Sequence, residues 1–126
     1  MTVQLNHTFV HASDGRGSAH WFAGVLGLGV DETGHFPTVR LANTVLLEFV
    51  QTTGVIAPQH YAFLVSDEEF DDIHARVTGL NRPYWAYPLH HGEGRFNDWA
   101  GGRGFYFDDP DGHSLEVMTR ASAVPG

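Results

Sequence analysis

The sequence predicts an α+β fold made of two tandem βαβββ modules. The first observation is a repeated segment, because LNHTFVHASD at residues 5–14 is echoed by PQHYAFLVSD at residues 58–67. When His7 is aligned with His60, the Ser-Asp pair that follows each histidine also aligns. The second observation is that each copy continues into a helical pattern and then into strand-like alternation. Together these features predict a duplicated unit of strand, helix and further strands.

Each copy of the repeat continues as an amphipathic helix. The first helix ends at Gly27 and the second at Gly79, because glycine commonly adopts the left-handed conformation that terminates a helix. The second helix is predicted over 67–78, where apolar residues recur at the spacing of one helical face. Ser66 and Glu69 fit a capping box, which satisfies free backbone amides in the first turn.

Alternating apolar residues predict the remaining strands of both modules. In the first module, FPTVRLA (36–42) and TVLLEFV (44–50) flank a turn at Asn43 and Thr44. In the second module, the candidate strands are YWAY, GFYF and HSLEVMT. The segment DDPDG between the last two is typical of a tight turn. Each module is therefore expected to follow the order strand, helix and three strands, and the eight strands to form a cupped mixed sheet.

Length and composition indicate one domain of residues 1–126, with modules at about 1–53 and 58–120. An apolar fraction of 42% is ordinary for a globular chain of 126 residues. Seven basic against fifteen acidic residues give a net charge of −8, which argues against binding to nucleic acid. No apolar run has the length of a membrane span or the form of a signal peptide, so we expect a cytoplasmic protein. Because cysteine is absent, chemistry falls to histidines, carboxylates, hydroxyls or a bound metal.

Two histidines and two glutamates occupy matching positions of the repeat. His7 corresponds to His60, and Glu48 corresponds to Glu116 in the last strand of each module. Side chains two apart on a strand share a face, so each of these polar groups stands in a largely apolar row. If the modules curve around a shared cavity, all four side chains project into it, where an unpaired carboxylate is costly. A divalent cation such as Fe, Mn, Ni, Co or Zn is the simplest partner.

The chain also carries a characteristic series of segments. These are LNHTFVHASD with SAHWFAGVLGLGV, then HYAFLVSDEEFDDI, and finally GFYFDDPDGHSLEVMT. The series resembles the vicinal oxygen chelate superfamily, which includes glyoxalase I, fosfomycin-resistance transferases, extradiol dioxygenases, methylmalonyl-CoA epimerase and bleomycin-binding proteins. The resemblance covers nearly the whole chain. It implies a glyoxalase-like pair of modules, commonly in a homodimer, with one divalent metal that chelates two neighbouring oxygens of a small-molecule substrate.

The resemblance implies that His7, His60 and Glu116 are metal ligands, with Glu48 as a fourth ligand or as a base. The leading expectation is a glyoxalase-like isomerase or lyase, in which the metal polarises two substrate oxygens and Glu48 moves a proton on carbon. Two alternatives use the same site, namely an extradiol-type dioxygenase with Fe(II) and a fosfomycin-type transferase. A further alternative is a resistance protein that sequesters an aromatic antibiotic without a metal.

Several residues modify these expectations. His11 stands where glyoxalases carry an arginine for the glutathione carboxylate, which argues against glutathione as part of the substrate. Phe9 stands where the transferases carry a threonine. Glu48 has a second interpretation as a carboxylate paired with Arg40 or Arg103 and without a bond to metal.

The second module is longer than the first, and the excess falls in PLHHGEGRFNDWAGGR, residues 88–103. A segment rich in glycine and histidine is expected to be irregular and to border the opening of a cupped sheet. It is either a lid, with Phe96 and Trp99 covering a substrate, or a surface loop with no chemical task.

Overall fold

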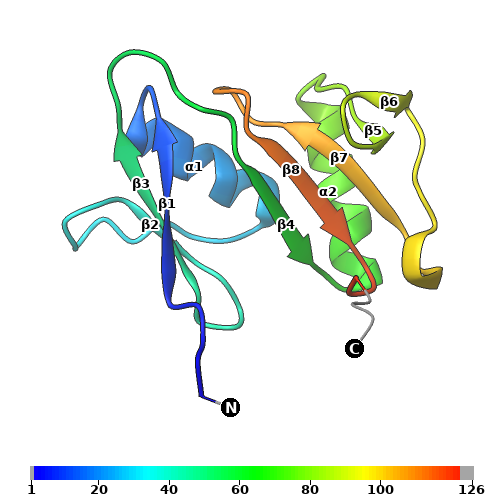
Figure 1. The fold of residues 1–126 in the computed structure, drawn as a ribbon, viewed down its shortest axis with the longest axis horizontal. Coiled ribbons are helices and arrows are strands. Elements are labelled where there is room, and N and C mark those ends of the chain that lie inside the picture. Colours follow the sequence, from blue (N-terminus) through cyan, green and yellow to red (C-terminus); the bar gives the residue numbers. More distant parts are fainter. Residues whose placement is uncertain (1, 123–126) are drawn as a thin grey trace. The chain divides into compact units, whose positions relative to one another are not determined.

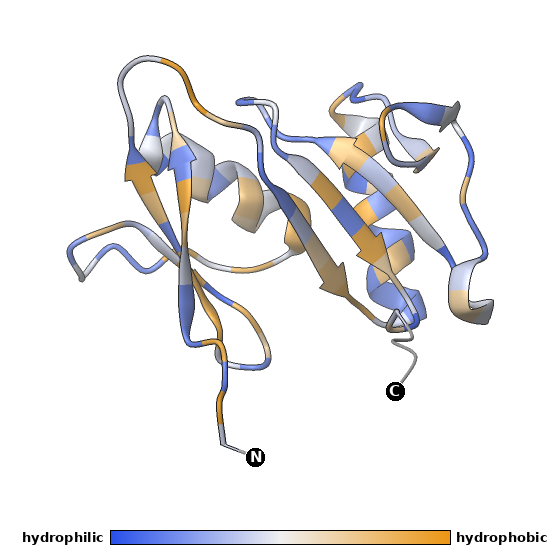
Figure 2. Cartoon of the chain, viewed as in Figure 1, coloured by the Kyte–Doolittle hydropathy of each residue, from blue (hydrophilic) through white to orange (hydrophobic). Residues whose placement is uncertain are grey.

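A computed structural model describes residues 2–122, so residue 1 and residues 123–126 of the expected domain lie outside it. The chain divides into two compact units, Met1–Ala57 and Pro58–Gly126. Each unit has its own sheet and its own helix (Figure 1). Hydrophobic residues are concentrated in the strands, whereas helix α2 is mostly hydrophilic with hydrophobic residues at intervals (Figure 2).

The first unit contains one helix and a three-stranded sheet. Its elements are β1 (His7–Ala12), α1 (Gly15–Leu26), β2 (Thr38–Arg40) and β3 (Leu46–Gln51). The strand order is β1-β3-β2, in which β1 runs parallel to β3 and β2 runs antiparallel to it. The parallel pair is possible because α1 forms the crossover between strands that point the same way.

Helix α1 has defined signals at both ends. The Asp14 side chain accepts a hydrogen bond from the Gly17 backbone N–H at 3.0 Å, which caps the first turn. Gly27 adopts a left-handed conformation with φ of 74° and ends the helix, as predicted. Buried Phe22 packs edge-to-face on Phe49 of β3 at 5.0 Å, which fixes the helix against one face of the sheet.

The second unit contains one α-helix, one 3₁₀ turn and a five-stranded sheet. Its strands run in the order β4-β8-β7-β5-β6, with β4 parallel to β8. Its elements are β4 (His60–Leu64), α2 (Asp67–Gly79), β5 (Trp85–Tyr87), β6 (His91–Glu93), η1 (Trp99–Gly101), β7 (Gly104–Asp108) and β8 (Ser114–Met118).

Helix α2 confirms the helix predicted over 67–78. Ser66 accepts from the Glu69 backbone N–H at 3.1 Å, and Glu69 accepts from the Ser66 backbone N–H at 2.9 Å, so both halves of the capping box form. The helix includes Gly79 as its last residue, and the left-handed residue beyond it is Asn81. Phe70 of α2 packs on Phe105 of β7 at 5.2 Å, so α2 covers one face of the sheet (Figure 1).

The α+β class is confirmed, and the strands divide unevenly between the units. The first unit has three strands instead of the expected four, and outside them the described residues form an isolated bridge between Asp31 and Thr38. The second unit has five strands because β6 forms within residues 88–103, a segment predicted to be irregular. The prediction missed β6, a strand of three residues that pairs with neighbouring β5 across the short turn at residues 88–90, because so short a strand shows no alternation of its own.

The DDPDG segment forms the predicted turn between β7 and β8. The carboxylate oxygen Oδ1 of Asp109 accepts hydrogen bonds from the backbone N–H groups of Asp111 at 3.0 Å and His113 at 2.7 Å. Gly112 has a φ of 89°, which glycine tolerates without strain. His113 is fully buried, and its Nδ1 accepts from the Gln59 backbone N–H at 3.0 Å. The turn therefore ties the start of β8 to the start of β4.

In the part of the chain that the structure describes, no helix is long and apolar enough to cross a membrane.

Candidate functional site

His60 and Glu116, two of the four predicted metal-binding residues, are brought together in the second unit. Strands β4 and β8 pair in parallel, with His60 opposite Ser114 and Ala62 opposite Glu116. The Nε2 atom of His60 lies 3.2 Å from Oε1 of Glu116. The histidine side chain is 48% exposed and the glutamate side chain only 9%. A half-exposed imidazole therefore stands over a buried carboxylate on the face of the sheet opposite α2.

The hydrogen bonding of His60 determines which of its nitrogens is available. Its Nδ1 lies 3.0 Å from the backbone carbonyl oxygen of Ser114. A carbonyl oxygen can only accept, so Nδ1 carries the hydrogen and donates it. In the neutral ring Nε2 then holds a lone pair, and this lone pair is directed at the lone pairs of the Glu116 carboxylate. Two acceptors at this distance need a proton or a cation between them.

The donor set fits a divalent metal ion. Two ligand atoms that are each about 2.1 Å from one ion, at an angle of about 90–110°, are separated by about 3.0–3.4 Å. The separation of 3.2 Å between His60 and Glu116 falls in that range. Histidines that bind metals usually donate their second ring N–H to a carbonyl or carboxylate, as His60 does to Ser114.

Tyr106 of β7 completes this cluster, and sequence analysis did not single it out. Tyr106 lies directly opposite Glu116 in the antiparallel β7–β8 pair. Its ring stacks on His60 with centroids 5.7 Å apart and an interplanar angle of 20°. Burial raises the pKa of the Tyr106 phenol, as do the negative charge of Glu116 and a hydrogen bond to that carboxylate. The phenol therefore stays protonated at neutral pH and donates to Glu116.

The first unit repeats the register of this site. His7 lies opposite Leu46, and Phe9 lies opposite Glu48, so Glu48 stands two places further along than its histidine, as Glu116 does. The side-chain contact is not repeated. Within the described part of the first unit, His7 forms no ion pair with Glu48, and its Nδ1 is instead 2.8 Å from the side-chain oxygen of Asn6. The duplication thus extends to the register of the paired strands, whereas the contact between histidine and glutamate side chains is made in the second unit.

The structure does not assemble the full predicted set. Among residues 2–122, no group of three or more histidine, aspartate and glutamate side chains is gathered as a metal site. The combination of His7 and Glu48 with His60 and Glu116 therefore stays a prediction.

Two further residues singled out in the sequence have clear partners. Arg103, weighed as a partner of Glu48, instead reaches α2, where it donates to Asp71 at 2.8 Å and to Asp67 at 3.1 Å. Its guanidinium also lies over the Phe70 ring. His11 shares the face of His7, and its Nδ1 lies 3.0 Å from Thr52 Oγ1. Arg103 therefore belongs to the packing of α2 against the sheet.

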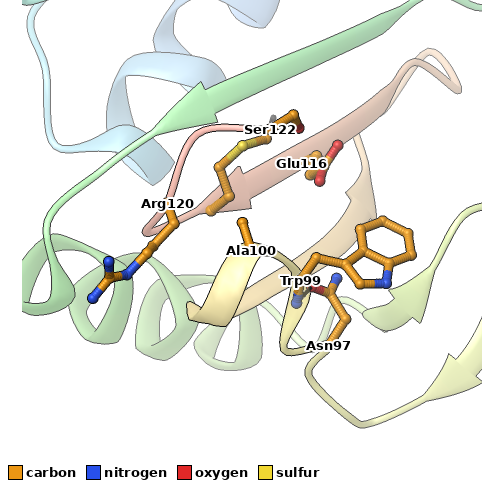
Figure 3. A pocket seen from close by; sticks show the side chains of 7 residues that line it. Asn97, Trp99, Ala100, Glu116, Arg120 and Ser122 are labelled. Carbon is orange, nitrogen blue, oxygen red and sulfur yellow. Dashed lines mark hydrogen bonds between the residues drawn. The ribbon is translucent and has the colours of Figure 1, made fainter. Parts of the chain in front are cut away.

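A cavity of about 270 Å³ adjoins Glu116 (Figure 3). Its lining includes Asn97, Trp99 and Met118. Trp99 is 48% exposed and lies edge-on to Tyr106, with ring centroids 6.2 Å apart. Tyr87 is a second neighbour of the indole, at 5.6 Å. An aromatic wall of Tyr87, Trp99 and Tyr106 therefore stands beside the carboxylate.

This wall is held in place by the 88–103 segment. Buried Asn97 donates to the Ala86 carbonyl oxygen at 2.7 Å, and its own side-chain oxygen accepts from the Trp99 backbone N–H at 3.1 Å. The 3₁₀ turn η1 follows, with Ala100 in a left-handed conformation at φ of 58°. Sequence analysis named Trp99 as a possible cover for a substrate, and the structure places it beside Glu116. Whether the segment moves as a lid stays a prediction.

A second cavity, of about 560 Å³, also adjoins the cluster. It is lined by His60 and Tyr106 together with Pro58, His90, Asp108 and Ser114, among others. The His60 ring therefore borders a space large enough for a small planar molecule.

Comparison with known proteins identifies relatives among transferases and oxidases. The chain is 30% identical over 132 residues to "Glutathione transferase FosA" of Serratia marcescens, which covers 98% of this chain and 86% of that protein. It is 48% identical to the solved structure of "Oxidase ChaP-H2", with a TM-score of 0.94 and full coverage of both chains. No family model matches. By their names, both relatives are enzymes.

More distant structures share the fold alone. The fosfomycin resistance protein FosX from Mesorhizobium loti is 20% identical, with a TM-score of 0.64 over 96% of this chain and 94% of that one. These matches agree with the duplicated strand register and with the Asp-Pro-Asp-Gly-His turn that precedes Glu116. The chain belongs to the vicinal oxygen chelate superfamily, as its 30% identity to FosA over 98% of its length shows.

Proposed function

We propose that this protein is a metal-dependent oxidase or oxygenase that acts on a small planar molecule with two adjacent oxygens, such as a catechol-like diol. The observation that carries the proposal is the 3.2 Å separation between His60 Nε2 and Glu116 Oε1, with His60 Nδ1 lying 3.0 Å from the Ser114 backbone carbonyl oxygen. The identity of 48% to a protein named an oxidase supports this reaction class over the glyoxalase-like isomerase or lyase that the sequence favoured.

In this proposal His60 and Glu116 are metal ligands, and His7 supplies the third ligand. Two histidines and one carboxylate are the ligand set of non-haem Fe(II) oxygenases. When bound, such an ion supplies open positions for two substrate oxygens and for dioxygen. The repeat supports His7, because it begins β1 at the position where His60 begins β4.

Glu48 stands in the proposal as either a fourth donor or a base. It occupies the register position of Glu116 in the first unit, but lacks the histidine contact that Glu116 has. The variant Glu48→Gln separates the two roles. Loss of metal affinity identifies a ligand, whereas unchanged metal content with slower turnover identifies a base.

The surroundings of Glu116 favour a planar substrate. Trp99 lines the cavity beside Glu116, and Tyr106 lines the larger cavity beside His60, so flat aromatic rings border both cavities next to the proposed metal ligands. The Tyr106 phenol donates to the Glu116 carboxylate and would hold this proposed ligand in position beside such a molecule.

Oxygen uptake tests the proposal. Protein loaded with Fe(II) is mixed with a panel of catechols, and dioxygen consumption is followed with an oxygen electrode. We expect uptake that depends on both Fe(II) and the catechol, and that is lost in Glu116→Gln. Protein loaded with Zn(II) is the control, since zinc has no redox chemistry. If Fe(II)-loaded protein consumes no more dioxygen than free Fe(II) across the panel, the oxidase proposal is wrong.

A fosfomycin-type transferase is the second candidate, because the chain is 30% identical to FosA over nearly its full length. Phe9 counts against it, since the transferases carry a threonine at that position. Incubation with fosfomycin, a thiol and Mn(II), followed by phosphorus NMR, distinguishes the two candidates. Formation of a thiol adduct would favour the transferase.

We also propose that the protein is a homodimer, as the resemblance to the superfamily implies. Light scattering coupled to size-exclusion chromatography measures this directly. A mass of two chains is expected, and a mass of one chain at micromolar concentration contradicts the proposal.

A further inference from the structure

His90 and Asp108 form a second polar pair in the second unit. His90 Nε2 lies 2.8 Å from Asp108 Oδ2. The histidine belongs to the turn that follows β5, and the aspartate is the last residue of β7, so the pair joins two elements that the sequence separates. Both side chains line the cavity of about 560 Å³ that also contains His60 and Tyr106.

A ring contact also positions His90, whose side chain is 59% exposed. It stacks on the Trp85 indole with centroids 4.0 Å apart and an interplanar angle of 23°. Leu89 and His90 both adopt the left-handed conformation, with φ of 60° and 62°. This conformation is unfavourable for a residue other than glycine, so the surrounding contacts hold the turn against a local preference. Such strain is found disproportionately at functional sites.

Strand alternation explains why this pair shares a cavity with the proposed metal ligand. Tyr106 and Asp108 are two residues apart on β7, so their side chains lie on the same face of the sheet. Tyr106 stacks on His60, and Asp108 holds His90. The lining of this cavity therefore includes both His60, the proposed metal ligand, and His90, which Asp108 orients.

The hydrogen bond to Asp108 also sets the chemistry of His90. A carboxylate accepts, so Nε2 of His90 carries the hydrogen. The neutral ring then has its lone pair on Nδ1, which makes that nitrogen a base oriented by a carboxylate. The other titratable groups of the cavity are committed, because the Tyr106 phenol donates to Glu116 and His60 is the proposed ligand.

We propose that His90, oriented by Asp108, is the acid–base residue that accepts the proton of a substrate hydroxyl when a diol binds in this cavity. The inference rests on the proposed function. In the step, the substrate O–H bond breaks, an N–H bond forms at Nδ1, and the oxygen keeps the electron pair. No oxidant or reductant takes part. The resulting alkoxide or phenolate is the form that a metal ion binds more tightly.

The test uses 4-nitrocatechol, whose ionisation changes its visible absorbance, bound to protein loaded with Zn(II) so that no oxidation follows. Absorbance of the bound probe is recorded against pH for the wild-type protein, His90→Gln and Asp108→Asn. We expect each variant to raise the apparent ionisation pH of the bound probe by about one unit, and to weaken its binding about 10-fold near neutral pH. Asp108→Asn acts by removing the carboxylate that orients the ring.

His91→Gln is the matched control, because it removes the neighbouring exposed histidine, which lies outside the lining of this cavity. We expect it to behave as wild type. If wild-type protein ionises the bound probe and both His90→Gln and Asp108→Asn do so at the same pH, the inference is wrong while the proposed function stands. If wild-type protein does not bind the probe, the proposed function fails and the inference fails with it.

Discussion

The Nε2 atom of His60 lies 3.2 Å from Oε1 of Glu116, with the opposite ring nitrogen committed to a backbone carbonyl. The arrangement leaves two electron-pair donors facing each other on adjacent parallel strands. Either a proton or a metal cation between these two atoms satisfies both, and the separation fits two ligands of one ion.

Removing either donor should abolish tight metal binding. We expect His60→Ala and Glu116→Gln to weaken binding of Fe(II) or Mn(II) by more than about 100-fold, since loss of an outer hydrogen-bond partner alone costs about 10–100-fold. Isothermal titration with each ion measures the effect, and His91→Ala serves as the control. Wild-type affinity in Glu116→Gln would show that this carboxylate is not a ligand.

Tyr106 should tune the metal site without being part of it. Its phenol donates to Glu116 and remains protonated because its pKa is raised, chiefly by burial. We expect Tyr106→Phe to keep the fold and the ring stacking on His60 but to lower metal affinity about 10-fold. Tyr87→Phe removes a hydroxyl from the same wall and provides the comparison. Equal metal affinities of Tyr106→Phe and Tyr87→Phe would show that the Tyr106 hydroxyl does not affect metal binding.

Trp99 should contribute to binding of a planar ligand. Aromatic pairs contribute about 0.5–1.5 kcal/mol beyond area burial, so Trp99→Ala should weaken binding of 4-nitrocatechol to Zn(II)-loaded protein about 5-fold. Trp99→Phe keeps a ring at this position and should recover part of the affinity. Titration followed by absorbance gives the dissociation constants. No difference between the alanine variant and wild type would place the ligand away from this wall.

Asp109 should give the protein a measurable pH dependence of stability. Burial raises the pKa of its carboxyl above the ordinary value of 3.8. The folded state therefore binds this proton more tightly than the unfolded chain, so the stabilising contribution is fully present below pH 3.8 and is lost as pH rises through the folded pKa. Asp109→Asn should remove this dependence, so wild type should lose stability relative to the variant as pH rises above 3.8 through the folded pKa.

The control variant is Asp109→Ala, which removes the hydrogen-bond acceptor together with the titrating group. Asp109→Ala removes the oxygen that accepts from the Asp111 and His113 backbone N–H groups, and should cost about 1–3 kcal/mol at every pH. Urea unfolding at a series of pH values measures both variants. A constant stability difference between wild type and Asp109→Asn from pH 4 to pH 7 would contradict the raised pKa.

Features set by local patterns could be predicted from the sequence. The capping box at Ser66 and Glu69 and the helix end at Gly27 depend on residues within a few positions of each other, and both form. The sequence repeat also predicted which strands carry the candidate metal ligands, because the two-residue alternation of a strand fixes the face on which each side chain lies. His60 and Glu116 were found in this way.

Features that depend on strand order were missed. Tyr106 reaches Glu116 only because β7 lies next to β8, and His90 meets Asp108 across 18 residues of sequence. Alternation in GFYF does place Tyr106 on the other face of the strand from the buried Phe105 and Phe107. Glu116 lies on that same face of the sheet, so pairing the two strands would have identified Tyr106 as its neighbour. The strand and turn within 88–103 carry no periodic signal.

Anomalous diffraction from crystals loaded with Fe(II), recorded at the iron absorption edge, tests the central claim most directly. We expect one anomalous peak about 2.0–2.2 Å from both His60 Nε2 and Glu116 Oε1, with a nitrogen of His7 as a third ligand. A peak bound elsewhere, or no peak in fully loaded crystals with His60 and Glu116 still in direct contact, would contradict it.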